Sequence, residues 1–148
     1  MSDKIKQPKN VEIKAQKAKV NLAWRNTFGK DSTQKFDTAQ EYVDSQCIEL
    51  MKRYTPEVNH ILVKSPVWGT KIGSGHIVYE SSYARYQYYG NVMVSTGGKG
   101  SKKIVAVPER QLKYSKAGAQ RLWFEVMKKQ HGEAILRGAA RIAGGKPK

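Results

Sequence analysis

The stretch FDTAQEYVDSQCIELMKRYTP, residues 36–56, decides much of the fold. Its apolar residues recur at steps of three and four, so they share one face of a helix: Phe36, Ala39, Val43, Cys47, Leu50 and Tyr54. Asp31 and Ser32 offer an N-cap ahead of this stripe. Pro56 disfavours helical geometry in the residue before it. We therefore expect a helix from near Asp31 to just before Pro56, with one buried face.

A second apolar stripe of helical spacing follows near the other end of the chain: Phe124, Met127, His131, Ile135, Ala139 and Ile142. The element begins near Ala117, and the sequence GGKPK after Ala143 cannot continue it. Gly132 and Gly138 each weaken the helix by roughly 1 kcal/mol relative to alanine. We expect a helix of moderate length, bent near Gly132.

Short extended segments account for most of the remaining sequence. Residues 18–24, AKVNLAW, alternate so that Val20, Leu22 and Trp24 form one face, which predicts a strand with that face buried. Further short strands are expected within 71–81, 89–96 and 102–109. Residues 55–70 hold two prolines around an apolar run and predict a short strand or a packed loop.

The expected fold is α+β, with an antiparallel sheet of about four to five short strands and two main helices packed on it. We expect a single domain over 1–148. It has a basic N-terminal arm (1–17), a globular core (18–143) and a C-terminal tail (144–148). The core between the helices and the sheet should contain Phe36, Val43, Cys47, Leu50, Phe124, Met127 and Ile135.

Charge is concentrated at the two ends of the chain. The formal net charge is +15, of which residues 1–30 carry +6, residues 31–109 carry +1 and residues 110–148 carry +8. Basic ends can meet nucleic acid or acidic protein surfaces, or they can be solvated tails that maintain solubility. A single cysteine excludes an intrachain disulfide and a cysteine metal cluster. No segment has the composition of a membrane span or a secretory signal.

The sequence offers no constellation for catalysis. The three histidines have no metal-ligand spacing, and Cys47 lies on the buried stripe of the first helix, where an inert thiol is expected. The glycine-rich pieces at 73–75 and 97–100 lack the spacing of a phosphate-binding loop, so flexible turns are the better interpretation. We therefore expect neither an enzyme nor a cofactor.

The segment SYARYQYYG, residues 82–90, carries the strongest functional signal. Tyr83, Arg85, Tyr86, Tyr88 and Tyr89 lie within seven residues of one another. Tyrosine and arginine are enriched at protein–protein hot spots. They also suit base stacking and phosphate binding in a single-stranded nucleic-acid module. A purely structural role and the wall of an active site remain as further alternatives.

Two motifs of this sequence resemble a known family. IGSGHIVYESSYARYQYYGNVM and LKYSKAGAQRLWFEVMKKQHGEAIL are similar to the minor capsid proteins of tailed phages that infect Gram-positive bacteria. The resemblance covers about residues 32–137. The matching positions are Tyr83, Ala84, Arg85, Tyr89, Gly90, Tyr114, Ser115, Gly118, Trp123, Phe124, Glu125, Met127 and Lys128. A Thr-Gly motif common in the family after the first helix is missing from residues 55–70.

The resemblance implies a structural virion protein in the neck between head and tail, assembled in the host cytoplasm. Such subunits form rings around the DNA channel, with six-fold symmetry our first expectation and twelve-fold our second. The implied partners are further copies of the chain and neighbouring connector and tail proteins. DNA would pass through the ring without sequence-specific contact, and no membrane would be involved.

Two groups of residues are then expected to make contacts in the ring. Tyr83, Arg85, Tyr86, Tyr88 and Tyr89 form the predicted subunit interface. The glycine- and lysine-rich segment is the predicted insertion loop, ordered by a neighbour: Gly97, Gly98, Lys99, Gly100, Lys102 and Lys103.

Overall fold

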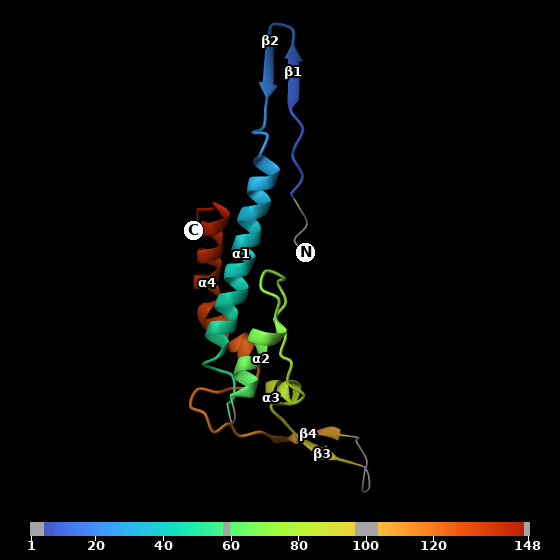
Figure 1. Cartoon of the computed structure of the whole chain (residues 1–148), viewed down its shortest axis with the longest axis vertical. Coiled ribbons are helices and arrows are strands. Elements are labelled where there is room, and N and C mark those ends of the chain that lie inside the picture. Colours follow the sequence, from blue (N-terminus) through green and yellow to red (C-terminus); the bar gives the residue numbers. More distant parts are fainter. Residues whose placement is uncertain (1–4, 58–59, 97–103, 147–148) are drawn as a thin grey trace.

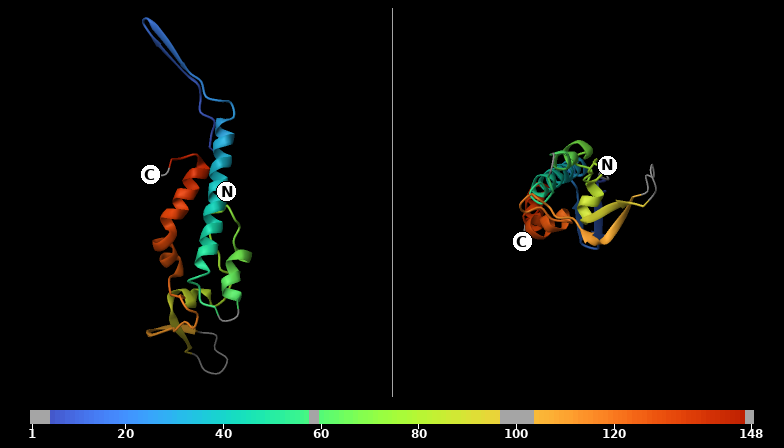
Figure 2. Two further views of the ribbon diagram at one scale, coloured as in Figure 1. Left: turned by 90° about the vertical axis from the view of Figure 1, so that its left-hand side faces the viewer. Right: turned by 90° about the horizontal axis from the view of Figure 1, so that it is seen from below.

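The structure is a computed structural model that describes residues 5–57, 60–96 and 104–146. It is an elongated, mixed α and β fold in which two long helices lie side by side and antiparallel (Figure 1; Figure 2, left). In chain order the elements are β1 (Val11–Ala15), β2 (Ala18–Leu22), α1 (Phe28–Met51), α2 (Ile61–Gly69), α3 (Ala84–Tyr89), β3 (Asn91–Ser95), β4 (Ile104–Gln111) and α4 (Trp123–Ala143).

The packing of α1 against α4 forms the centre of the molecule. The α1 residues Cys47 and Met51 are buried in one cluster with Trp123, Met127 and Ile135 of α4. Gly138 allows the two helices to approach closely, because a Cβ atom there would lie 2.3 Å from the Tyr42 hydroxyl oxygen. The second glycine of the predicted helix thus leaves room for the Tyr42 side chain, and α4 spans Trp123–Ala143 without a break.

Most of the predicted core is confirmed. Cys47, Met127 and Ile135 are buried, while Val43, Leu50 and Phe124 are partly buried against the same cluster. The predicted burial of Phe36 is wrong, because its side chain is 53% exposed. The helix begins earlier than expected, at Phe28. Its N-terminal half extends beyond the small elements α2 and α3, which lie beside its C-terminal half (Figure 1).

The strands do not form the expected sheet of four to five strands in the described residues. Instead, β1 pairs only with β2, and β3 pairs only with β4, in two separate antiparallel sheets. Figure 1 places these two hairpins at opposite ends of the molecule. The predicted buried face of the 18–24 strand is also wrong. All ten residues of β1 and β2 are exposed, because β2 pairs with residues 11–15 of the predicted arm and not with a central sheet.

Residues 61–69 form the helix α2, where a strand or loop was predicted. Proline and β-branched residues disfavour a helix, and Pro66 lies inside this one. Burial outweighs that preference, since Leu62, Ser65 and Pro66 are all enclosed by the fold. The helix therefore depends on tertiary contacts that local propensity does not reveal.

The predicted strand within 71–81 is absent from the structure, although its alternation is correct. Ile77 and Tyr79 pack against the core, and Val78 between them is exposed. No strand among the described residues pairs with this segment. Its Val78 amide donates instead to the Thr70 hydroxyl oxygen at 2.9 Å.

The segment between β4 and α4 makes hydrogen bonds both to α3 and to the residues that follow α1. The Gln120 amide donates to the Tyr54 carbonyl at 3.0 Å, and the Leu122 amide donates to the Tyr88 carbonyl at 2.7 Å. Lys116 donates from Nζ to the Lys52 carbonyl at 2.7 Å, after the end of α1, and lies 3.2 Å from the Glu57 carboxylate. A cation at this position satisfies carbonyls that a helix end leaves without partners.

We expect the Glu57 carboxylate to make the protein less stable at low pH. Hydrogen bonds from Lys116 and then His60 hold the pKa of its carboxyl below the ordinary value of about 4.5. A lowered pKa contributes stability that is present above pH 4.5 and lost as the pH falls through the folded-state value. The free energy of unfolding, measured with urea, should therefore fall more between pH 5 and pH 3 for the wild type than for Glu57→Gln. Identical pH profiles for the two chains would contradict the assignment.

Candidate functional site

The glycine-rich turn at 73–75 is held in place by a buried carboxylate of α1. Asp44 is 2% exposed, and its Oδ2 accepts the amides of Gly73 at 2.8 Å and Gly75 at 3.1 Å. Its Oδ1 accepts Nε2 of Gln40 at 2.8 Å. Both glycines have positive φ, +87° and +74°, which is costly for other residues and lets their amides converge. The amides of the turn thus bind the Asp44 carboxylate, and this contact holds in place the chain that continues into residues 76–79.

The tyrosine-rich segment forms the short helix α3, and this splits the cluster into an inner and an outer group. Tyr88 is partly buried and meets the Trp123 ring edge-on at 4.8 Å between centroids. Tyr83 precedes the helix and also packs against the core. Arg85 and Tyr89 are exposed, and Tyr86 is intermediate. Gly90 ends the helix with a φ of +73°.

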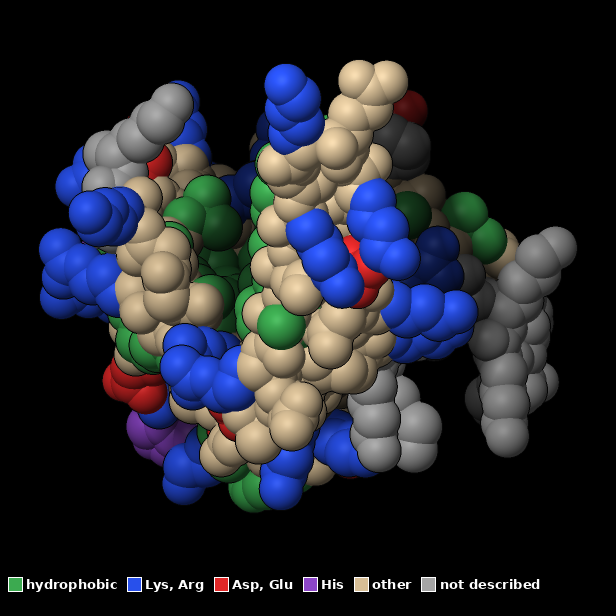
Figure 3. Space-filling model, turned by 90° about the horizontal axis from the view of Figure 1, so that it is seen from above, with side chains coloured by type: hydrophobic (Ala, Val, Ile, Leu, Met, Phe, Trp, Pro, Cys, Tyr) green, Lys and Arg blue, Asp and Glu red, His purple; other side chains and the backbone are tan. Residues whose placement is uncertain are grey.

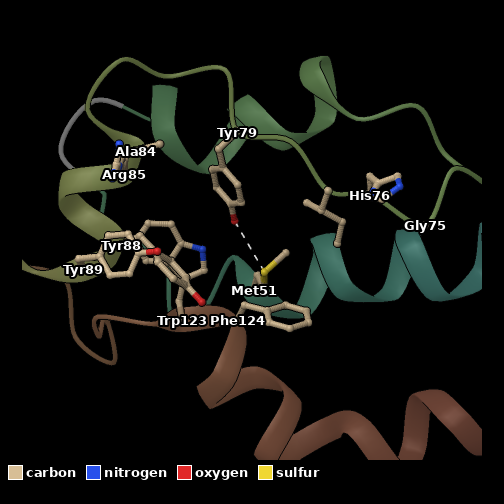
Figure 4. Close-up of a pocket in the computed structure, with 11 residues that line it drawn as sticks. Met51, Gly75, His76, Tyr79, Ala84, Arg85, Tyr88, Tyr89, Trp123 and Phe124 are labelled. Atoms are coloured by element: carbon tan, nitrogen blue, oxygen red, sulfur yellow. Dashed lines mark hydrogen bonds between the residues drawn. The ribbon is translucent and has the colours of Figure 1, made fainter.

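An aromatic groove of about 540 Å³ lies between α3, the 75–79 segment and the start of α4 (Figure 4). The rings of Tyr79, Tyr88 and Trp123 line this groove, and the ring centroids of Tyr79 and Trp123 are 5.5 Å apart. Tyr89 stands edge-on to Tyr88 at 5.4 Å between centroids and contributes an exposed wall. The remaining lining includes Met51, His76, Ile77, Arg85 and Phe124.

Two phenols of this groove, Tyr79 and Tyr88, have raised pKa values. Burial raises the pKa of Tyr79 above its ordinary value of 10, and burial followed by the nearby Glu125 raises that of Tyr88. Tyr79 makes contact through its hydroxyl with Thr55 Oγ1 at 3.3 Å and donates to Met51 Sδ at 3.9 Å (Figure 4). A general base needs a pKa nearer the working pH. The groove therefore suits the contact of apolar and aromatic groups.

Two further candidates for chemistry, Cys47 and His131, are engaged in packing. Cys47 is 8% exposed, and burial raises the pKa of its thiol, as expected for an inert cysteine. His131 lies with Nε2 3.0 Å from the Tyr54 hydroxyl. Across the part of the chain that the structure describes, no group of three His, Cys, Asp or Glu residues could hold a metal ion. None of its helices combines the length and apolar character that crossing a bilayer requires.

The structure brings three of the five predicted interface residues to one surface. Arg85, Tyr86 and Tyr89 line a second cavity of about 370 Å³ with Asn91 and Met93 of β3 and Val105 and Ala106 of β4. Tyr83 and Tyr88 turn toward the core instead. The predicted insertion loop from Gly97 to Lys103 lies outside the described residues.

Two further exposed apolar surfaces were not predicted from the sequence. One is the face of the β1–β2 hairpin, where Ile13 and Val20 pair across the strands. The other is the outer side of α2, where Val67 and Trp68 are exposed, Trp68 by 65%. The hairpin had a signal in the mirrored alternation of residues 11–15 and 18–22. Its loop contains Gln16 and Lys17, which are not the glycine or asparagine that mark tight hairpins. Lys and Arg side chains predominate over acidic ones on the end that carries this hairpin (Figure 3).

Comparisons of the chain with protein-family models, curated proteins and solved structures find no significant match.

Proposed function

We propose that this chain is a structural virion protein, a ring-forming subunit of the head–tail connector of a tailed phage. The observation that carries the proposal is the number of separate apolar surfaces on so small a chain. The hairpin face, the Trp68 side of α2 and the aromatic groove lie on different elements. A monomer rarely leaves large apolar patches uncovered, and such patches mark contact sites.

A ring subunit needs surfaces of this kind in several places. Each copy must meet a neighbour on two different faces, and it must also bind proteins above and below the ring. The resemblance of the segments around Tyr83–Gly90 and Trp123–Lys128 to phage minor capsid proteins supports the same role. Six copies are our first expectation for the ring and twelve our second, with DNA passing through it without sequence-specific contact.

The open strand edges support an assembly in which sheets are completed between copies. The pair β3–β4 has no further strand in the described residues. Exposed edges accept strands from other chains through backbone hydrogen bonds. In the ring, strands from neighbouring copies would extend this pair into a larger sheet.

The test is assembly with an altered α3 surface. In a phage whose own copy of this gene is inactivated, a plasmid would supply the chain with Arg85→Glu and Tyr86→Ala. Both side chains lie on the outer part of α3, so the variant should fold but fail to assemble. Electron microscopy should then show DNA-filled heads and free tails, whereas the wild type and the conservative pair Arg85→Lys and Tyr86→Phe restore joined particles. Joined particles with the first variant would exclude this surface as the interface.

A single-stranded nucleic-acid module is the second candidate, and one observation favours it. Arg85, Tyr86 and Tyr89 share one solvent-facing cavity, and a cation beside aromatic rings is a common arrangement for binding bases and phosphates. Titration of labelled single-stranded DNA against salt separates the two functions. Binding that survives physiological salt with a base preference supports this module, and binding lost uniformly with salt indicates charge attraction alone.

A further inference from the structure

The β1–β2 hairpin has one wholly apolar face that the described residues leave uncovered. Its cross-strand pairs are Val11 with Leu22, Ile13 with Val20, and Ala15 with Ala18, so these six side chains share one face. The four larger ones are between 47% and 62% exposed. On the opposite face, Glu12 lies 3.1 Å from both Lys14 and Lys19. Because an isolated two-stranded hairpin is marginal in water, a surface that covers the apolar face would stabilise it.

The size of this face limits what can cover it. Five residues in each strand make a face of about 17 by 10 Å, far less than the roughly 800 Å² per partner of a stable complex. The hairpin alone therefore cannot hold a separate partner firmly. The hairpin face is large enough to serve as one of several contacts between neighbouring copies in a closed ring.

Charge indicates which surface of a second copy fits the hairpin. Residues 9–22 contain four lysines and one glutamate, whereas residues 37–49 of α1 contain four carboxylates and no lysine or arginine. Two of those carboxylates are engaged, Asp44 with the glycine turn and Glu49 with Lys52. Asp37 and Glu41, one turn apart, have no ion pair with any described residue. Phe36, next to Asp37, is 53% exposed.

We propose that the hairpin of one copy packs its apolar face over Phe36 on α1 of the next copy. Lys17 in the hairpin loop then lies near Asp37 and Glu41, while Lys14 and Lys19 stay with Glu12 on the outer face of the hairpin. The two surfaces differ, so the contact is heterologous and propagates from copy to copy until the ring closes. The inference rests on the proposed function, because a ring supplies the other contacts that this small one needs.

Disulfide trapping between full-length chains tests the contact. A chain with Ile13→Cys is mixed with a chain with Phe36→Cys and oxidised mildly. We expect a disulfide-linked dimer from the mixture, and a ladder of oligomers from a chain that carries both changes. Adding Asp37→Lys and Glu41→Lys to the Phe36→Cys chain should slow trapping about tenfold at low salt, through the loss of exposed charge pairs.

Matched controls place the cysteine on the wrong face of each element. Asn21 lies on the opposite face of the hairpin from Ile13. Ser45 is an exposed α1 residue two and a half turns beyond Phe36, so it points to the opposite side of the helix. Neither Asn21→Cys with Phe36→Cys nor Ile13→Cys with Ser45→Cys should give the dimer. The wild-type chain, whose Cys47 is buried, should not form it either.

Four outcomes would overturn the contact. Rapid dimers of Ile13→Cys alone would mean that hairpins pair with each other, and a cross-link within one dilute chain would mean that the hairpin folds onto its own helix. Efficient trapping by the control pairs would mean that collisions are nonspecific. Rings seen by native mass spectrometry without trapping would reject this contact and leave the proposed function standing. Trapping without any ring or virion incorporation would support the contact and reject the proposed function.

Discussion

Replacing Trp123 by alanine is expected to destabilise the chain by about 3–5 kcal/mol, the typical cost of truncating a buried large aromatic residue. Trp123 is 1% exposed and contacts the rings of both Tyr79 and Tyr88. Its loss would remove the side chain that joins α4, α3 and the 75–79 segment. Since a domain of this size is stable by about 5–15 kcal/mol, much of the total stability would disappear.

Urea unfolding followed by far-ultraviolet circular dichroism measures this effect. Trp68→Ala is the matched control, because Trp68 is 65% exposed and its loss should change stability by only about 0.5 kcal/mol. Equal effects of the two substitutions would show that Trp123 is not the centre of the core.

Asp44→Ala is expected to cost about 2–5 kcal/mol, because it leaves the converging amides of Gly73 and Gly75 without their shared acceptor. Asp44→Asn should cost less, since one side-chain oxygen can still accept both amides. The damage should concentrate in residues 71–79, which the carboxylate anchors to α1.

Limited proteolysis and hydrogen exchange would locate that damage. In Asp44→Ala, cleavage and amide exchange should rise first around the glycine turn, before the α1–α4 pair opens. Glu41→Gln is the control on the same helix, because Glu41 is exposed and should be nearly neutral. A uniform loss of protection over the whole chain would contradict a local anchor.

The sequence predicted the elements whose signals are local and repeated. The α1 and α4 stripes have helical spacing, and their residues Cys47, Met127 and Ile135 are buried as expected. The end of α4 near Ala143 follows from the glycines after it. The mixed α and β content was also predicted correctly.

The features that were missed depend on contacts between distant residues. Asp44 and its turn are about thirty residues apart, and no local pattern connects a helical carboxylate with glycines in a loop. Residues 61–69 form a helix although Pro66 lies inside it, because their burial against other elements decides the outcome. The role of the tyrosine cluster as an interface stays a prediction, and its division into inward and outward residues required the helical geometry of α3.

The three tryptophans of the chain occupy three different environments, and this makes each a natural optical reporter. Trp123 is enclosed, Trp68 faces solvent on α2, and Trp24 lies at the base of the hairpin against the Phe28 ring, 4.9 Å away between centroids. Aqueous iodide should quench the emission of Trp68 and leave that of Trp123 unaffected. Shielding of the Trp68 signal, or a blue shift of the Trp24 signal, would then reveal which end of the molecule another chain has covered, without any added label.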